Sequence, residues 1–361
     1  MATIDEVREA LGHVEDPELH RDLVSLGMVK DIGVQDGKVA VTVELTTPAC
    51  PLCGKIQEDC ERALRALPGV TQVEVTIAAR TRGSKSGSAE AKDLLPGVKN
   101  VVLIASGKGG VGKSAVAINV AATLAQRGAR TGLLDADIYG PSIPTMMGVQ
   151  KKPQVIRVED KEKMVPVPAH GVGLMSIGFF LDPAQAVIWR GPMLHKALSQ
   201  FLEDVHWGEM DYLIVDVPPG TGDVHISMAQ LIKAAGAVLV TTPQTVALAD
   251  VVRGRNMFRS VGIPVLGLVE NMSTFICDGC GKEHHIFSKG GGQRAAAQLE
   301  VPFLGEIPLI TAIRESCDEG VPVVLRDPAG AAAKAYGKIV DAVVGELAKR
   351  AVGSESHLKL V

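Results

Sequence analysis

The spacing of apolar and polar residues divides the chain into two parts. In the first 80 residues, a capping-box pattern at Thr3–Glu6 predicts a helix start, and alternating residues flank the hairpin-type turn Asp36-Gly37. Leu52, Ile56 and Cys60 begin a three-to-four-residue repeat typical of a helix with a buried stripe. This part is therefore predicted as a small α+β domain at 1–80, with a helix over 3–12, strands over 28–34 and 38–45, a helix over 52–67 and a strand over 73–77.

A different pattern begins after a segment rich in glycine, serine and charge, which predicts a flexible linker at 81–97. From residue 98 to 350, apolar strands alternate with helical repeats, and this alternation predicts an α/β domain with a mostly parallel sheet covered by helices on both faces. Residues 149–168 are expected to be irregular or a hairpin, and 351–361 to form a tail after a last helix over 329–350. The strands are predicted to end at Ser106, Asp135, Asp216, Thr242 and Asn271.

One glycine-rich loop lies between the first of these strands and a helix. Gly107, Gly112 and the pair Lys113-Ser114 fit G-x-x-x-x-G-K-[ST], in which backbone N–H groups surround phosphates, the lysine reaches the β/γ oxygens and the hydroxyl ligates Mg²⁺. The loop is thus a candidate ATP site. Its predicted nucleotide-binding residues are Gly107, Lys108, Gly109, Gly110, Val111, Gly112, Lys113 and Ser114.

The same loop also fits G-x-G-x-x-G, with Asp135 after the next strand, so a dinucleotide site is an alternative. Lys113-Ser114 favours a triphosphate, because a dinucleotide site needs neither the lysine nor a magnesium-binding hydroxyl at that place. A second acidic strand end agrees. Asp216, followed by Val-Pro-Pro-Gly-Thr-Gly222, looks like a Walker B carboxylate with a loop that senses the γ-phosphate.

Composition narrows the class of protein and its partners. The chain has 361 residues, 22% of them charged, with a formal net charge of −4, so no overall basic field favours nucleic acid. Apolar runs are far shorter than the roughly 20 residues that a membrane helix needs, and the N-terminus lacks the apolar core of a signal peptide. We expect no membrane association and a cytoplasmic location, where six cysteines would be thiols or metal ligands.

Two C-x-x-C pairs are candidate thiol sites. Cys277 and Cys280 could converge on one metal, but two ligands leave a tetrahedral site incomplete. His284 or His285 could complete zinc, a second chain could supply two more thiolates at a twofold axis, or the thiols could form a redox pair or be incidental. Cys50 and Cys53 lie at the N-terminus of a predicted helix, which is expected to lower a thiol pKa, although incidental thiols are an equal alternative.

Together these motifs give the chain a specific resemblance. The early lysine, Lys108, makes the loop resemble the deviant Walker A of MinD, ParA and the nitrogenase iron protein. With DADIYGPS at 135–142, DVPPGTGD at 216–223, ENMS at 270–273 and C-x-x-C at 277–280, the chain is similar to the Mrp/ApbC iron–sulfur carrier family. Residues 1–80 resemble the iron–sulfur assembly domain fused to such proteins.

The resemblance implies roles for individual residues. Lys108 would act across a homodimer on the partner's nucleotide. Asp137 would orient the attacking water, and Asp135 or Asp216 would hold the magnesium shell. Helix capping or turn formation is the alternative role for Asp135 and Asp137. Asn271 would contact the adenine edge or form a turn. The resemblance also implies that Cys277 and Cys280 from two chains share one iron–sulfur cluster, of the 4Fe-4S type.

The resulting hypothesis is an ATPase that takes an iron–sulfur cluster from a scaffold protein and transfers it to apoproteins. A MinD/ParA-like positioning ATPase would share the nucleotide motifs but does not need the C-x-x-C, and a reductase that passes electrons through the cluster is a further alternative. The small domain is expected to assist delivery, with Cys50 as its contacting thiol.

Overall fold

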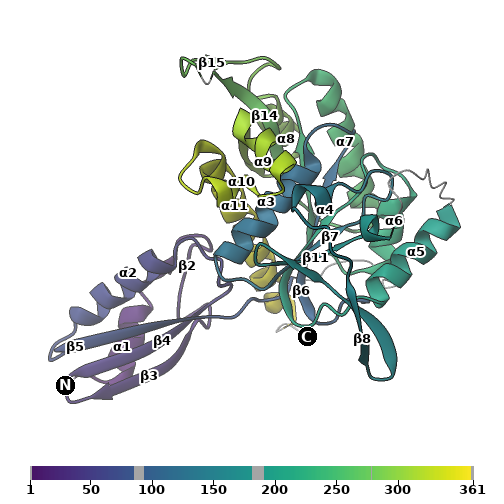
Figure 1. Cartoon of the computed structure of the whole chain (residues 1–361). Helices are drawn as coiled ribbons and strands as arrows, with labels where there is room; N and C mark the ends of the chain where they lie inside the picture. The colour runs from purple at the N-terminus through teal and green to yellow at the C-terminus, as the bar shows by residue number, and fades with distance from the viewer. Residues whose placement is uncertain (1, 85–92, 181–190, 278, 359–361) are drawn as a thin grey trace. The chain divides into compact units, whose positions relative to one another are not determined.

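The computed structural model of the chain describes residues 2–84, 93–180, 191–277 and 279–358 (Figure 1). It divides into two compact units, one made of residues 1–84 with 344–361 and the other of residues 85–343. Part of the predicted linker, residues 85–92, lies outside the described residues. The two units are described separately below.

The first unit contains the predicted helix-strand-strand-helix-strand order, with two short strands that were not predicted between its first helix and the hairpin. Its three-stranded sheet has the order β3-β4-β5, with β3 antiparallel and β5 parallel to β4. The Thr3 hydroxyl accepts the Glu6 amide and the Glu6 carboxylate accepts the Thr3 amide, which confirms the predicted capping box. The elements are α1 (Ile4–Leu11), β1 (Glu15–Asp16), β2 (Arg21–Asp22), β3 (Val29–Gln35), β4 (Lys38–Leu45), α2 (Cys53–Arg65) and β5 (Gln72–Ala79).

Alternation places one face of this sheet against the two helices. Val39, Val41 and Val43 of β4 are buried with Ile56 and Leu64 of α2. Cys60 belongs to the same core and is fully buried, as the helical repeat predicted. Cys53, at the start of α2, lies outside this core and is exposed.

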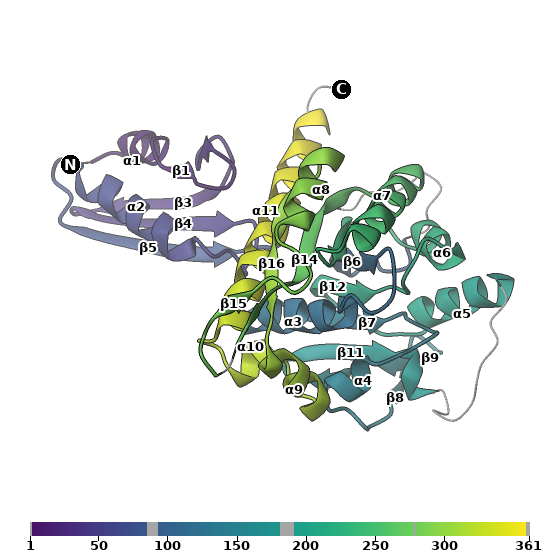
Figure 2. The same ribbon diagram turned by 90° about the horizontal axis from the view of Figure 1, so that it is seen from above.

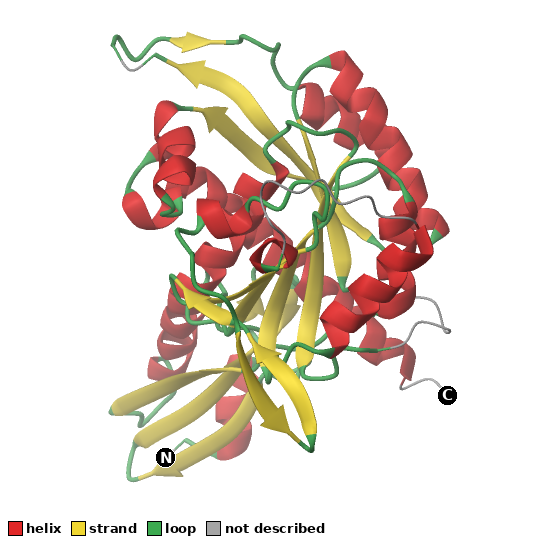
Figure 3. Ribbon diagram, turned by 45° about the vertical axis from the view of Figure 1, so that its right-hand side comes forward, coloured by secondary structure: helices red, strands yellow, loops and turns green. Residues whose placement is uncertain are grey.

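The second unit is built on one large sheet, which Figure 3 shows as a fan of strands between helices. The described residues form a nine-stranded sheet in the order β10-β11-β7-β12-β6-β13-β14-β15, with β16 also paired to β14. All neighbours are parallel except at β10 and β15, so the predicted mostly parallel sheet is confirmed. Its strands are β6 (Val98–Ser106), β7 (Thr131–Asp135), β10 (Val167–Ala169), β11 (Val172–Ser176), β12 (Met210–Asp216), β13 (Gly236–Thr241), β14 (Val265–Ile276), β15 (Glu283–His284) and β16 (Phe303–Leu309).

Helices cover both faces of this sheet (Figure 2). On one face α3 packs on β6, β7 and β12 and contacts α4 and α10, while α7 and α8 pack together over β13 and β14 on the other. Strands β6, β12 and β13 are buried along almost their whole length, as expected for a parallel sheet covered twice. The helices are α3 (Lys113–Gln126), α4 (Ile143–Met146), α5 (Gly191–Glu203), α6 (Asp223–Leu231), α7 (Thr245–Ser260), α8 (Gly291–Leu299), α9 (Thr311–Glu319), α10 (Val323–Arg326) and α11 (Ala331–Leu358).

Two elements run beyond their predicted ends. Strand β14 does not stop at Asn271 but bends there, with a positive φ at Met272, and continues to Ile276, where it pairs with β15. Helix α11 continues past Arg350 to Leu358, although glycine and serine weaken its last turns. Val352 packs on the core of the first unit, so a tertiary contact outweighs the low helix propensity there.

Residues 149–168, expected to be irregular or a hairpin, contain a hairpin of β8 (Gln154–Val158) and β9 (Lys161–Val165). No helix among the described residues combines the length and the apolar character that a membrane span requires.

The Asp36-Gly37 turn gives a stability prediction. Gly37 has a φ of +79°, and a Cβ there would lie 3.0 Å from the Gly69 carbonyl, so Gly37→Ala should destabilise the hairpin by about 1–2 kcal/mol. Gly33→Ala is the matched control, because its Cβ would meet Ala40 only at ordinary contact distance, 3.9 Å. Hydrogen exchange of the β3–β4 peptides should become faster in the first variant alone. Equal exchange in both variants would contradict the turn geometry.

Candidate functional site

The glycine-rich loop lies at the carboxyl edge of the sheet. Strand β6 ends at Ser106 between β12 and β13, residues 107–112 form the loop, and α3 begins at Lys113. The two flanking strands bring their own ends to the same edge, because all three run parallel. The amide of Gly220, from the loop after β12, donates to the Ser106 carbonyl at 2.8 Å. The predicted phosphate loop and the predicted sensing loop therefore lie together.

The last glycine of the loop is required by its surroundings. Gly112 has a φ of +81°, and a Cβ there would lie 2.2 Å from the side-chain nitrogen of Asn271. That nitrogen donates to the Val111 carbonyl at 2.8 Å, and Asn271 is only 6% exposed. Only glycine permits both the left-handed backbone and this close approach. The structure thus assigns Asn271 a contact with the phosphate loop, while its contact with adenine stays a prediction.

Lys113 and Ser114 meet the carboxylate at the end of β12. The Lys113 ammonium donates to Asp216 at 2.6 Å and lies 3.4 Å from Asp137, and the Ser114 hydroxyl donates to Asp216 at 2.5 Å. The side chain of Asp216 is fully buried and that of Lys113 is 6% exposed. The motif residues that the sequence separates by about a hundred positions are therefore in direct contact.

A second carboxylate lies beside Asp216. Asp135 ends β7 in register with it, and burial first, then the charge of Asp216, raises the pKa of Asp135 to about 7. The Ser176 hydroxyl donates to Asp135 at 2.9 Å, and the amide of Ile143 donates to the same oxygen at 3.2 Å. Ser176 was not predicted as a site residue. Ser176 is the last residue of β11 and lies opposite Asp135 because β11 pairs with β7. From the sequence alone, only its place at the end of an apolar strand could have pointed to it.

The carboxylates and the Ser114 hydroxyl form an oxygen donor set of the kind that Mg²⁺ prefers. No group of three or more acidic, histidine or cysteine side chains is arranged as a complete metal cage within the described residues. Magnesium at phosphate sites is normally held by one or two protein oxygens together with phosphate oxygens and water, so an open set fits this ion. Ser114 and Asp216 would hold it, and the ion would neutralise charge on the phosphates.

Asp137 and Lys108 lie at the open side of the site. One Asp137 oxygen faces Lys113, and the other is buried with no hydrogen-bond partner among the described residues. An oriented water would satisfy that oxygen, as the predicted role requires. Lys108 is half-buried, and its own carbonyl accepts the Ser106 hydroxyl at 2.9 Å. Its predicted role across a dimer stays a prediction.

Cys277 and Cys280 follow β14, whose last residues form an arm with β15 at the edge of the sheet (Figure 1). Beyond Asn271, β14 pairs with β15 to form this arm. At its turn, the backbone amide of Gly281 donates to the backbone carbonyl of Cys277 at 2.8 Å. Cys280 is exposed and Cys277 half-buried. His284 pairs with Phe275 on the stem, and no third ligand joins the two thiols within the described residues. Among the described residues, the arm thus presents two cysteine thiols, and a cluster shared between two chains stays a prediction.

The other C-x-x-C, Cys50 and Cys53 of the first unit, has a different environment from the one expected. Burial, together with the nearby charges of Glu18 and Asp16, raises the pKa of Cys50 to about 11, whereas the sequence predicted a lowered value. The prediction was wrong because the helix N-terminus is outweighed by desolvation of a half-buried thiol. Cys53, at the exposed start of α2, is the accessible thiol of the pair.

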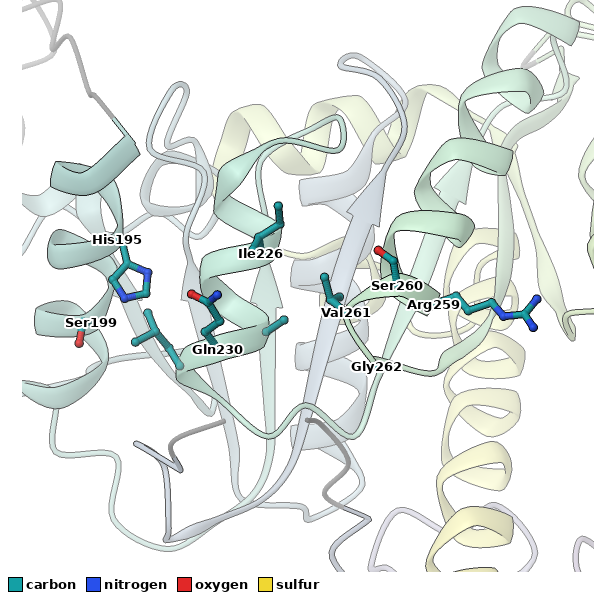
Figure 4. Close-up of a pocket in the computed structure, with 10 residues that line it drawn as sticks. His195, Ser199, Ile226, Gln230, Arg259, Ser260, Val261 and Gly262 are labelled. Carbon is teal, nitrogen blue, oxygen red and sulfur yellow. The ribbon is translucent and has the colours of Figure 1, made fainter. Parts of the chain in front are cut away.

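A separate hollow lies between α5, α6 and α7 (Figure 4). Its volume is about 640 Å³, and it is open to solvent. The C-terminal ends of α6 and α7 line it, so it is at the edge of the sheet where the strands begin, away from the phosphate loop. None of the predicted site residues contributes to it.

Fold and site together define a P-loop NTPase. The fold agrees with that of an Archaeoglobus fulgidus nucleotide-binding protein solved in complex with ADP, at a TM-score of 0.56 and 36% identity over 63% of this chain and 89% of that one. The Pyrococcus furiosus cell division ATPase MinD is more distant, with a TM-score of 0.52 and 25% identity over 68% of this chain and 98% of MinD.

The chain belongs to the family described as NUBPL iron-transfer P-loop NTPase, whose profile matches residues 97–344. Residues 4–76 match the family described as iron-sulfur cluster assembly protein. Proteins named iron-sulfur cluster carrier protein from Synechocystis and Deinococcus radiodurans are each 50% identical to the chain, over 98% and 96% of it and over 100% and 96% of their own lengths. The resemblance to the Mrp/ApbC carriers is confirmed.

The raised pKa of Asp135 predicts a pH dependence of stability. Between about pH 4 and 7 the folded chain holds a proton on Asp135 that the unfolded chain has lost, so the free energy of unfolding should fall as the pH rises through this window. Asp135→Asn should remove about 1–3 kcal/mol of this fall between pH 5 and 8. The measurement is urea unfolding with a magnesium chelator, followed by tryptophan fluorescence. Equal pH slopes in both proteins would show that Asp135 titrates normally.

Proposed function

We propose that the chain is an ATP-hydrolysing carrier that receives an iron–sulfur cluster, its cargo, and transfers it to apoproteins. The observation that supports this most directly is that one strand, β14, holds the phosphate loop through Asn271 and continues to Cys277 on the exposed arm. The relatives that match over almost the whole chain are named iron-sulfur cluster carrier proteins. A positioning ATPase of the MinD type would have no use for the thiols on the arm.

In the proposed nucleotide chemistry, the phosphate loop binds ATP and the carboxylates at the strand ends act on it. Lys113 would release Asp216 and bind the β/γ oxygens, and Asp216 with Ser114 would turn to magnesium. Asp137 would hold the attacking water through its buried, unpartnered oxygen. The partner's Lys108 would add positive charge to the transferred phosphoryl group in a homodimer.

The cargo site would be completed by symmetry. Two thiolates from each arm give four ligands at a twofold axis, which suits a 4Fe-4S cluster. An exposed arm supports transfer, because an acceptor's thiolates can approach Cys280 without the sheet opening. The half-buried Cys277 would keep the cluster attached while the exposed ligand exchanges.

For the N-terminal domain we propose a role in delivery. The sequence predicted Cys50 as the thiol that contacts a client, but the burial of the two thiols favours Cys53. Cys50 is half-buried with a raised pKa, so the exposed Cys53 is the accessible contact. The family of cluster assembly proteins that matches residues 4–76 supports a place in the same process.

The two loop lysines should separate binding from turnover. Lys113→Ala should weaken ATP binding at least about a hundredfold, because it removes the charge on the β/γ oxygens and leaves Asp216 buried without its partner. Lys108→Ala should leave the Kd for ATP within about twofold and lower kcat at least about tenfold. Fluorescent nucleotide titration and phosphate release measure the two quantities. Equal loss of affinity in both variants would make Lys108 an ordinary loop contact.

The cargo site predicts one cluster per two chains. Cys277→Ser or Cys280→Ser should abolish iron and sulfide binding after anaerobic reconstitution, and ATP affinity should stay within about twofold of the wild type. Cys317→Ser, a change to a half-buried thiol of α9, is the matched control and should keep the full cluster. Zinc at one ion per chain, lost in His284→Ala, would instead establish a site within a single chain.

A further inference from the structure

His225 is a buried histidine close to the nucleotide site that the proposed chemistry does not use. It is the third residue of α6, directly after the sensing loop Val217–Gly222, and it is 1% exposed. Its ring packs edge to face against Phe258 of α7, with centroids 5.8 Å apart. The ring is therefore fixed on a helix at the point where the sensing loop ends.

Neither ring nitrogen of His225 has a hydrogen-bond partner among the described residues. An unpaired buried nitrogen destabilises the fold, and a phenylalanine would make the same aromatic contact without this cost. Such a group calls for an explanation other than packing. The charges of Lys113 and Asp137 both act on the ring, which places His225 within electrostatic reach of the phosphate site.

The sensing loop has few donors of its own with which to fix its position. Pro218 and Pro219 have no N–H, and the Gly220 amide already donates to Ser106. Pro219 lies against the phosphate loop, since a Cβ on Gly109 would be 3.9 Å from its ring. The Val217 amide donates to the Ile104 carbonyl at 3.2 Å, so the loop is held on both sides of the two prolines, but the prolines themselves supply no donor.

The backbone carbonyls of Gly222 and Pro218 both act on the ring and favour the protonated form of His225, while burial lowers its pKa more strongly. The Gly222 carbonyl already accepts the backbone amide of His225 at 3.1 Å. The Pro218 carbonyl, near the start of the loop, is left as an acceptor for a ring N–H of His225.

We propose that His225 is a positioning residue for ATP hydrolysis. Its neutral ring donates one N–H to the Pro218 carbonyl when the sensing loop closes on the γ-phosphate, and so fixes the loop amides relative to the phosphate loop. His225 itself does not touch the nucleotide. The inference rests on the proposed ATP hydrolysis and assigns this chain a determinant of turnover on the rigid helix α6.

The test compares two replacements of the ring in the full-length protein. His225→Phe keeps the packing on Phe258 but has no N–H, so kcat should fall at least about tenfold while the Kd for ATP stays within about twofold and the Tm rises by a few degrees. His225→Gln restores an N–H donor, and its kcat should return to within about threefold of the wild type. Ile226→Ala, a change at the exposed next residue, is the control.

A histidine that only fills space would give a different result. Wild-type kcat in His225→Phe, or equal loss in the phenylalanine and glutamine variants, would overturn the proposal. If His225→Phe folds poorly, His225→Leu replaces it, and the ratio of kcat between the glutamine and leucine variants decides. If the wild type does not hydrolyse ATP, the proposed function is overturned instead. This result differs from the ones that overturn the role of His225 alone.

Discussion

The site depends on the buried contact between Lys113 and Asp216. Parallel pairing of β6 with β12 sets Asp216 opposite Ile104, so the carboxylate lies directly beside the start of the phosphate loop. Removing either partner would leave a buried charge without compensation, at a cost of about 3–5 kcal/mol. Phosphate and magnesium can take the places of the two partners, so ATP would enter without leaving either charge unpaired. The sheet register therefore sets the chemistry.

Strand β14 extends this dependence to the cargo site. Glu270 accepts the Gly292 amide at the start of α8, Asn271 holds the Val111 carbonyl, and Ser273 donates to β16 at Ile307. The same strand ends at Ile276, directly before Cys277. A movement of the phosphate loop would displace β14 through its contact with Asn271. Because the arm is the end of this strand, the displacement would reach the arm. This gives the proposed coupling of ATP hydrolysis to cluster transfer a physical route.

Local signals predicted most of this architecture. The capping box at Thr3, the Asp36-Gly37 turn and the buried strands ending at Asp135 and Asp216 all appear where periodicity and turn chemistry indicated. What could not be predicted depends on contacts between distant segments. The course of β14 beyond Asn271 requires pairing with β15 and β16, and α11 continues because Val352 packs on the core of the first unit, to which residues 344–361 belong. The pKa of Cys50 likewise depends on burial, which its position at a helix start does not reveal.

In the proposed function, the arm carries a cluster that leaves the protein. The most direct measurement mixes the anaerobically reconstituted chain with an apo form of an enzyme that needs a 4Fe-4S cluster, with a chelator present to trap released iron, and follows both the acceptor's activity and the donor's visible absorption. The account predicts that the acceptor becomes active as the donor loses its cluster, and that Cys280→Ser gives no activation. An inactive acceptor beside a donor that keeps its cluster, and that instead passes electrons, would contradict the account and establish a reductase.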